Sequence, residues 1–247
     1  MSGHSKWANI KRKKQANDLV RGNLFSKLSR LITIAVLEGG GTTDPENNIR
    51  LRLAIEKAHI SNMPKENISR AIERGIGPDK AQLKEIIYEV FAPSGIVIVI
   101  LATTDNPNRT LSEIRNHLEK HEGKLGNQGS VLYLFKKCGK IIFKKSEATE
   151  KEVLSFVEMI KAFDIDEDDN HFTVYFSFES LGKIKDYLRG LKYEIAEVDY
   201  KPNSLIELKD KVKEQKILSL VESLEELDDV QKVFTNLKIG NEHISSY

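Results

Sequence analysis

The chain has 247 residues, of which 40% are hydrophobic and 30% charged, and its formal net charge is +1. This composition excludes a wholly disordered chain, and the length argues for two or three domains. The longest apolar run, over residues 96–102, is far shorter than the roughly 20 residues of a membrane helix. The first residues lack the apolar core of a signal peptide, and the single cysteine excludes an intramolecular disulfide framework. We therefore expect a soluble, cytoplasmic protein.

The first 80 residues follow the 3.6-residue period of helices. Three helices are predicted there, through residues 24–36, from Asp44-Pro45 and from Met63-Pro64. The second start rests on an acceptor side chain that directly precedes a proline. Gly75 is expected to end the third helix, and the stretch 75–79 is the best candidate for a linker.

After this linker, strands alternate with helices. The predicted elements are a hairpin of 86–92 and 96–104, a helix over 110–121, strands over 131–135 and 140–143, a helix over 149–162, a strand over 172–178, a helix near 180–190, a strand near 194–200, a helix through 217–227 and a strand within 230–239. Between Lys140 and Tyr200 the order is that of the ferredoxin-like split βαβ motif. We therefore predict an α+β protein, and this fold alone does not define a function.

The charges are distributed unevenly along the chain. Residues 1–30 hold eight basic side chains and one acidic side chain, residues 1–80 carry a formal charge of +7, and residues 81–247 carry −6. A basic end joined to an acidic body predicts an anionic partner for that end only.

The strongest functional signal is the basic segment near the start of the chain, which has too few apolar residues to bury a wide face. Phosphates suit such a segment, because each phosphate that it neutralises releases a counterion. The side chains that we expect to contact nucleic acid here are Lys6, Trp7, Lys11, Arg12, Lys13, Lys14, Arg21 and Lys27. Two alternatives are a solvated face near a flexible terminus and an autoinhibitory contact between this segment and the acidic body.

A second candidate for anion binding is the start of the helix after the hairpin. Helix N-termini bind anions, and Arg109 could add a bidentate contact to a phosphate. Thr110 and Glu113, however, have the spacing of a capping box. We therefore favour a structural cap with an optional role in anion binding.

Candidate metal and catalytic sites are incomplete. Glu113, His117 and His121 share one helix face, but the glutamate of the zincin motif is missing between the histidines. The acidic stretch 164–170 resembles a calcium loop without its glycine and its final glutamate, so it reads as an acidic hairpin tip. Cys138 has no identifiable base. We predict a protein that is not an enzyme, with no metal, cofactor or small-molecule substrate.

Several motifs, spread in order over nearly the whole chain, resemble the YebC/PmpR family of probable transcriptional regulators, which includes the mitochondrial translational activator of cytochrome oxidase subunit I. The matching stretches are Gly3–Lys11, Arg21–Gly22 with Phe25–Leu28, Asn48–Arg52, Asn62–Ile68, Thr104–Asn106 with Asn108–Thr110, Leu125–Gly126 with Gly129–Val131, and Leu227–Gln231.

The resemblance implies three domains: a helical domain over 1–80, an α/β domain formed by 81–133 together with 205–247, and a ferredoxin-like α/β domain over 134–204 inserted between those two segments. It also implies DNA binding and transcriptional control for some members of the family. For others it implies association with the ribosome and help in translating proline-rich stretches. We therefore predict a DNA-binding transcriptional regulator, with a ribosome-associated, RNA-binding translation factor as the alternative.

Overall fold

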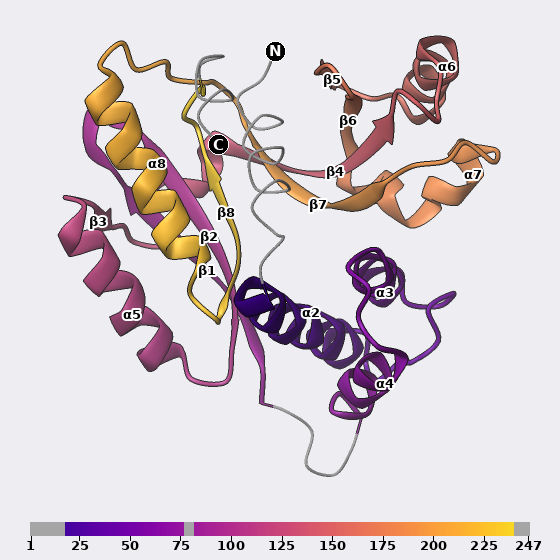
Figure 1. Cartoon of the computed structure of the whole chain (residues 1–247), viewed down its shortest axis with the longest axis horizontal. Coiled ribbons are helices and arrows are strands. Elements are labelled where there is room, and N and C mark those ends of the chain that lie inside the picture. Colours follow the sequence, from indigo (N-terminus) through magenta and orange to yellow (C-terminus); the bar gives the residue numbers. More distant parts are fainter. Residues whose placement is uncertain (1–17, 77–81, 240–247) are drawn as a thin grey trace. The chain divides into compact units, whose positions relative to one another are not determined.

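The computed structural model describes residues 18–76 and 82–239, with side chains from Gly22 onward. These residues form two compact units. The first consists of residues 18–134 together with Ser204–Lys238, and the second of Phe135–Asn203. Each unit contains one four-stranded sheet (Figure 1), and the first also contains the N-terminal helices. The predicted mixture of helical region and two α/β sheets is confirmed.

The helical region of the first unit consists of three helices: α2 (Asp18–Glu38), α3 (Ile49–Ile60) and α4 (Lys65–Glu73). They enclose a small apolar core formed by Leu28, Ile32, Ala35, Val36, Leu51, Ala54, Ala58, Met63, Ile68 and Ala71. Gly75 ends this region next to α2, where an added Cβ would lie 2.7 Å from the side chain of Val36. The predicted end of the third helix at this glycine is therefore confirmed, and the close approach to Val36 leaves no room for a side chain at position 75.

The predicted start of the second helix at Asp44-Pro45 is wrong. Helix α3 begins at Ile49, and its N-cap is Asn48, whose side chain accepts a hydrogen bond from the Leu51 amide at 3.1 Å. The amide group of Asn48 also donates to the carbonyl oxygens of Ala35 and Thr42, which ties the cap to the end of α2. Asp44 forms a local turn instead by accepting from the Glu46 amide.

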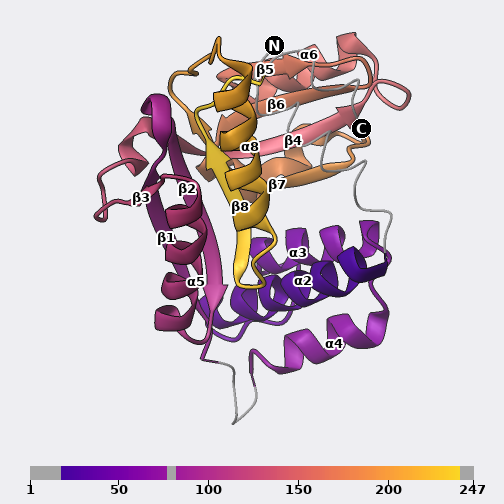
Figure 2. The ribbon, with the colours of Figure 1, turned by 60° about the vertical axis from the view of Figure 1, so that its left-hand side comes forward.

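The first sheet has the order β3-β1-β2-β8, and it contains β1 (Lys84–Phe91), β2 (Val97–Thr104), β3 (Lys124–Leu125) and β8 (Val230–Thr235). All three pairings are antiparallel, so β2 and β3 are parallel to each other with β1 between them. Helices α5 (Pro107–Lys120) and α8 (Lys211–Glu225) lie together against this sheet (Figure 2). The sheet is a permuted form of the ferredoxin-like order: the strand that lies between the first two parallel strands joined by a helix comes first in the chain here, whereas in the usual order it comes third.

The predicted strand over 131–135 is wrong in its first part. Residues Leu132–Leu134 form a 3₁₀ turn, and the strand β4 runs over Phe135–Lys144. Backbone amides in and just before this turn donate to the buried carboxylate of Glu89, which accepts from Gly129 and Val131 at 2.5 Å and from Leu132 at 2.7 Å. A carboxylate that takes these amides replaces the ladder hydrogen bonds that a strand would make.

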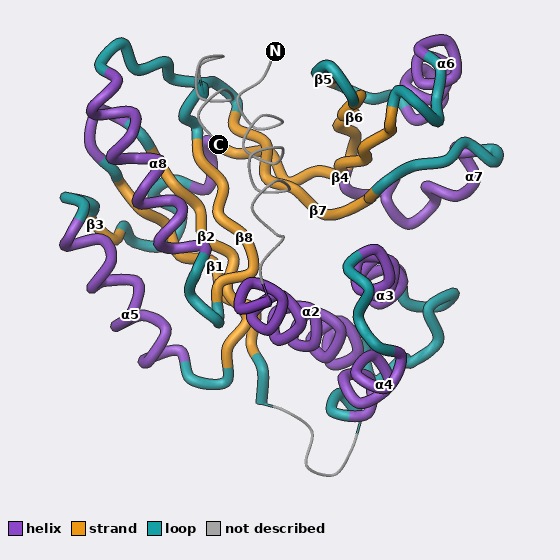
Figure 3. Tube along the Cα trace, viewed as in Figure 1, coloured by secondary structure: helices purple, strands orange, loops and turns teal. Residues whose placement is uncertain are grey.

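The second unit has the ferredoxin-like order predicted for residues 140–200 (Figure 3). Its sheet has the order β5-β6-β4-β7, with all pairs antiparallel. Its remaining elements are α6 (Glu150–Ile160), β5 (Asp164–Glu167), β6 (His171–Ser177), a 3₁₀ segment (Phe178–Lys183), α7 (Ile184–Leu188) and β7 (Ile195–Pro202). The acidic stretch is thus an edge strand followed by a tight turn.

The two faces of this second sheet differ in chemistry. One face packs Phe143 and Phe176 against Phe156 of α6 in edge-on contacts, with ring centroids 5.2 and 6.4 Å apart. The other face buries charged groups: the Lys140 ammonium lies 2.8 Å from Glu197 and 2.7 Å from Asp199. On the same face Lys201 pairs with Asp164 and Asp166, so the first two carboxylates of the calcium-like pattern are partners of a lysine.

Close packing of Gly139 against the ring of Phe176 generates a testable prediction. A Cβ at position 139 would lie 2.3 Å from Phe176 Cε2, and Phe176 is fully buried. We expect Gly139→Ala to lower the free energy of unfolding by about 1–3 kcal/mol, because the ring must shift in a packed core. Urea denaturation measures this change.

The matched control is Gly182→Ala, since no atom lies within 4 Å of the Cβ that this substitution adds. That variant should stay within about 0.5 kcal/mol of the unsubstituted protein. Equal stabilities of the two variants would contradict the close contact at Gly139.

Candidate nucleic-acid interface

Most of the basic side chains predicted to contact nucleic acid lie outside the described residues. These are Lys6, Trp7, Lys11, Arg12, Lys13 and Lys14. Arg21 is part of α2, and its side chain is not described. The described part of the chain therefore bears on Lys27 and Arg109, and on basic residues that the sequence patterns did not single out.

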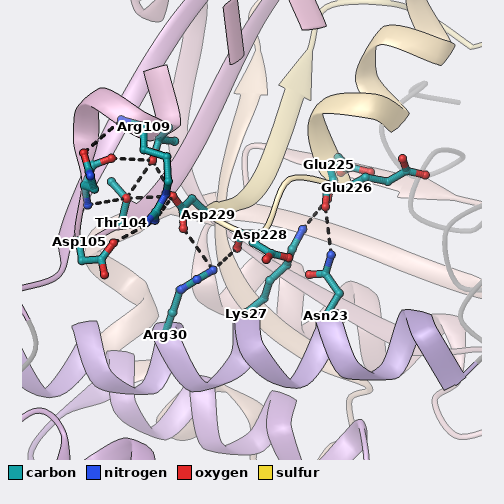
Figure 4. Close-up of polar contacts among 12 residues, drawn as sticks. Asn23, Lys27, Arg30, Thr104, Asp105, Arg109, Glu225, Glu226, Asp228 and Asp229 are labelled. Atoms are coloured by element: carbon teal, nitrogen blue, oxygen red, sulfur yellow. Dashed lines mark hydrogen bonds and ion pairs between the residues drawn. The ribbon is translucent and has the colours of Figure 1, made fainter. Parts of the chain in front are cut away.

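Lys27 lies on a face of α2 that contacts the end of α8 and the loop after it (Figure 4). Its ammonium donates to the carbonyl oxygen of Glu225. Asn23, one turn earlier, donates to the Glu226 carbonyl oxygen at 3.0 Å, and Arg30, about one turn later, donates to that of Asp228. The carbonyl groups at the end of a helix carry partial negative charge and lack intrahelical partners. This face of α2 therefore caps α8, and Lys27 has a structural contact within the chain.

The carboxylate of Asp229, only 2% exposed, is the centre of a second group of contacts. Its Oδ2 atom accepts hydrogen bonds from Thr110 at 2.6 Å, Arg109 at 2.8 Å and Thr104 at 3.0 Å. Its Oδ1 atom lies 3.3 Å from Nη1 of Arg30. Burial acts to raise the pKa of Asp229, but the three hydrogen bonds and the charge of Arg30 outweigh it and hold the pKa below the ordinary value of 3.8.

The predicted capping box at Thr110 is wrong. Helix α5 begins at Pro107, and its N-cap is Asn106, whose side chain accepts from the Arg109 amide at 3.1 Å. Thr110 is fully buried, and its hydroxyl is within hydrogen-bond distance of the Asp229 carboxylate and of the Thr104 hydroxyl. The actual cap lies four residues earlier and is an acceptor side chain directly before a proline, whereas the predicted one rested on the spacing of Thr110 and Glu113.

Arg109, the predicted phosphate ligand at this helix start, is held by two carboxylates. Its Nη2 atom lies 2.9 Å from Asp105 and 2.8 Å from Asp229. The side chain is 45% exposed, so part of the guanidinium faces solvent. The contacts establish a structural role for Arg109 within the chain, and its contact with nucleic acid stays a prediction.

A groove between α2 and α4 is lined by several basic side chains. Its lining residues are Phe25, Ser26, Ser29, Arg30, Met63, Asn67, Arg70 and Arg74. Three of them are arginines and none is acidic, so the lining carries a formal charge of +3. Arg70 and Arg74 are exposed, and neither has an ion-pair partner within residues 22–76 and 82–239. The serine and asparagine side chains add neutral hydrogen-bond donors beside these cations.

The sequence contains a signal for this groove, although the groove residues form no run of consecutive cations. Asn67, Arg70 and Arg74 are spaced by three and four residues, so they lie on one face of α4. Ser26 and Arg30 have the corresponding spacing on α2. The two faces are brought together only by packing of α2 against α4, which the periodicity of either helix alone does not predict.

The groove has the chemistry of a site for phosphate groups. Guanidinium groups bind phosphate oxygens bidentately, and hydroxyl and amide groups donate single hydrogen bonds to them. Across the described ranges, no three His, Cys, Asp or Glu side chains lie close enough together to hold a metal ion.

The fold and this groove define a class of protein: an α+β protein whose helical region presents arginines on a groove beside the first of two ferredoxin-like sheets. The chain matches the model of the TACO1/YebC protein N-terminal domain over residues 5–78 and that of the TACO1/YebC second and third domain over residues 83–237. It belongs to the TACO1/YebC family.

Relatives of similar length support this assignment. A probable transcriptional regulatory protein of Aquifex aeolicus is 44% identical over 98% of both chains, and one of Borrelia turicatae is 45% identical over 98% of this chain and 99% of the relative. The crystal structure of a conserved hypothetical protein from Aquifex aeolicus superposes with a TM-score of 0.85 at 42% identity, covering 93% of this chain and 95% of that chain. The family is thus one of regulatory proteins. Of the helices described here, none is long and apolar enough to cross a membrane.

The low pKa of Asp229 predicts a specific dependence of stability on pH. A carboxylate whose pKa is lower in the folded state stabilises that state above pH 3.8, and this contribution is lost as the pH falls through the folded-state pKa. We expect Asp229→Asn to lower the free energy of unfolding by about 1–3 kcal/mol at pH 7, because it leaves buried donors poorly matched. The difference between the two proteins should shrink below pH 3.8, as followed by urea denaturation at each pH.

The control is Asp105→Asn, which removes the other carboxylate that Arg109 contacts. Asp105 is 62% exposed, so its ion pair should contribute less than about 1 kcal/mol. A pH-independent difference between the unsubstituted protein and Asp229→Asn would contradict the assigned role of the Asp229 charge.

Proposed function

We propose that the protein is a nucleic-acid-binding regulator, and specifically a DNA-binding transcriptional regulator. The observation that carries the proposal is the groove lined by Arg30, Arg70 and Arg74 without any acidic residue. Arg70 and Arg74 have no acidic partner in the described ranges, and such arginines on a protein surface favour a polyanion over a neutral ligand. The names of the relatives, which are probable transcriptional regulatory proteins, favour DNA among the polyanions.

The basic segment before α2 supports the same proposal from the sequence. Its cations at Lys11–Lys14 precede the helix that forms one side of the groove. Phosphate contacts from the segment and from the groove would add to one another, since each releases a counterion from the nucleic acid. In this proposal the protein acts by binding and does not catalyse a reaction.

The alternative proposal is a ribosome-associated translation factor that binds RNA and helps in the translation of proline-rich stretches. Phosphate contacts position a protein on either nucleic acid without reading its sequence, so the groove suits RNA as well. The two proposals therefore differ in the partner found in cells, and that partner is what has to be measured.

Binding to duplex DNA should depend steeply on salt, with a measurable share from the groove. Each lost phosphate contact flattens the log–log slope of the binding constant against salt by about 0.9. We expect the double variant Arg70→Ala/Arg74→Ala to flatten the slope by about 2 and to weaken binding at low salt. Fluorescence anisotropy with a labelled duplex over a series of salt concentrations measures both quantities.

The matched control is Arg115→Ala/Lys120→Ala, which removes the same charge from exposed positions on α5. It should change the slope less than the groove variant does. Equal slopes for the two double variants would assign the binding to net charge alone and would contradict a site in the groove.

Crosslinking in cells, followed by sequencing of the bound DNA and RNA, decides between the two partners. A DNA-binding regulator should give peaks at promoters, and these should be lost in Arg70→Ala/Arg74→Ala. Peaks confined to ribosomal RNA would overturn the proposal of a transcriptional regulator and support the translation factor.

A further inference from the structure

Arg30 belongs to two groups of contacts at once. It lines the groove with Arg70 and Arg74, and it also contacts the Asp228 carbonyl oxygen and the Asp229 carboxylate. On α2 it lies four residues after Ser26 of the groove and three residues after Lys27, which contacts the end of α8. It is therefore at the boundary between the face that forms the groove and the face that contacts the α8–β8 loop.

The guanidinium of Arg30 has N–H donors that its contacts with the loop do not use and that a ligand could take. A guanidinium carries five N–H donors, and both contacts to the loop use the same atom, Nη1. Within the described ranges, neither Nε nor Nη2 of Arg30 makes a hydrogen bond or an ion pair. The side chain is 28% exposed, so a ligand in the groove can reach it.

The carboxylate that holds Arg30 is itself fixed. Thr104, Thr110 and Arg109 all donate to Oδ2 of Asp229, which leaves Oδ1 for Arg30. In the described part of the chain Oδ1 is buried and accepts no hydrogen bond, so its contact with Arg30 at 3.3 Å is an ion pair. The Asp229 carboxylate, which the first sheet and α5 hold in place, thus fixes the position of the Arg30 guanidinium. The positions of Arg70 and Arg74 are fixed by α4 instead.

We infer that Asp229 is a positioning residue for the nucleic-acid site: by holding Nη1 of Arg30, it keeps the Nε and Nη2 donors ready for a phosphate group that Arg70 and Arg74 also contact. This inference rests on the proposed function of the groove. A prearranged guanidinium loses less conformational entropy when the phosphate binds. The coupling is reciprocal, so a bound phosphate also stabilises the contact between α2 and the α8–β8 loop.

The decisive experiment compares the full-length protein with Asp229→Asn in binding to a fluorescein-labelled duplex DNA. Removing a negative charge from the protein should by itself strengthen binding to a polyanion. The positioning role requires the opposite, and we expect the affinity to fall by about fivefold to tenfold. Near-ultraviolet circular dichroism of each variant at the temperature of the assay establishes that it is folded.

Two further variants separate positioning from loosening of the loop contact. Asn23→Ala removes a neighbouring hydrogen bond to the loop without changing any charge, and its affinity should stay within about twofold of the unsubstituted protein. Arg30→Lys keeps the charge but loses the planar group of N–H donors, so it should weaken binding as much as Asp229→Asn does. The double variant Arg30→Lys/Asp229→Asn should be no weaker than Arg30→Lys alone.

The outcomes distinguish this inference from the function on which it rests. Tighter or unchanged binding by Asp229→Asn, together with weaker binding by Arg70→Ala/Arg74→Ala, overturns the inference and leaves the groove as the site. An unsubstituted protein that does not bind the duplex, or a groove variant that binds equally well, overturns the function. If Asp229→Asn does not fold, Arg30→Lys decides: unchanged binding by that variant overturns the inference.

Discussion

The buried carboxylate of Asp229 joins segments that are far apart in the sequence. Its oxygens contact the end of β2 through Thr104, the first turns of α5 through Arg109 and Thr110, and α2 through Arg30. A buried charge is tolerated only when it is paired and hydrogen-bonded. The positions of these segments are therefore linked, since a shift of any one of them would leave the carboxylate short of a donor. The helical region and the first sheet depend on this interaction for their common geometry.

The same interaction places structural and functional charges side by side on α2. Asn23 and Lys27 contact backbone carbonyl groups at the end of α8 and just after it, whereas Ser26 and Ser29 line the groove. Arg30 does both. A basic residue in this helix is thus not by itself evidence for a nucleic-acid contact, and the partner of each cation has to be known before a role is assigned. In the proposed function, Arg70 and Arg74 are the clearest ligands because they have no acidic partner in the described ranges.

Local patterns in the sequence predicted most elements, and they failed where side chains from distant segments intervene. The helical period identified α2 and α4, and the element order identified the second sheet. The start of α3 was missed because Asn48 is held by carbonyl groups at and just after the end of α2. The turn before β4 was read as a strand because its amides are bound by Glu89, about 40 residues away. For the groove, the spacing on α4 was visible, but its partner face on α2 was not, since helix packing alone brings them together.

The second unit interrupts the first one in the chain, and this has a consequence for the order in which the protein can fold. Leu134 and Ser204 border the insertion, and its terminal residues are adjacent, with Phe135 paired to Pro202. The strand β8 and Asp229 are synthesised only after the whole insertion, so the contacts of Arg30 and Arg109 with Asp229 can form only after the residues of the intervening unit have been synthesised. Contacts that close such long loops form slowly. Until β8 has been synthesised, the nascent chain therefore lacks the strand that covers the edge of β2 and the carboxylate that pairs with Arg30, and an uncovered strand edge favours misassembly.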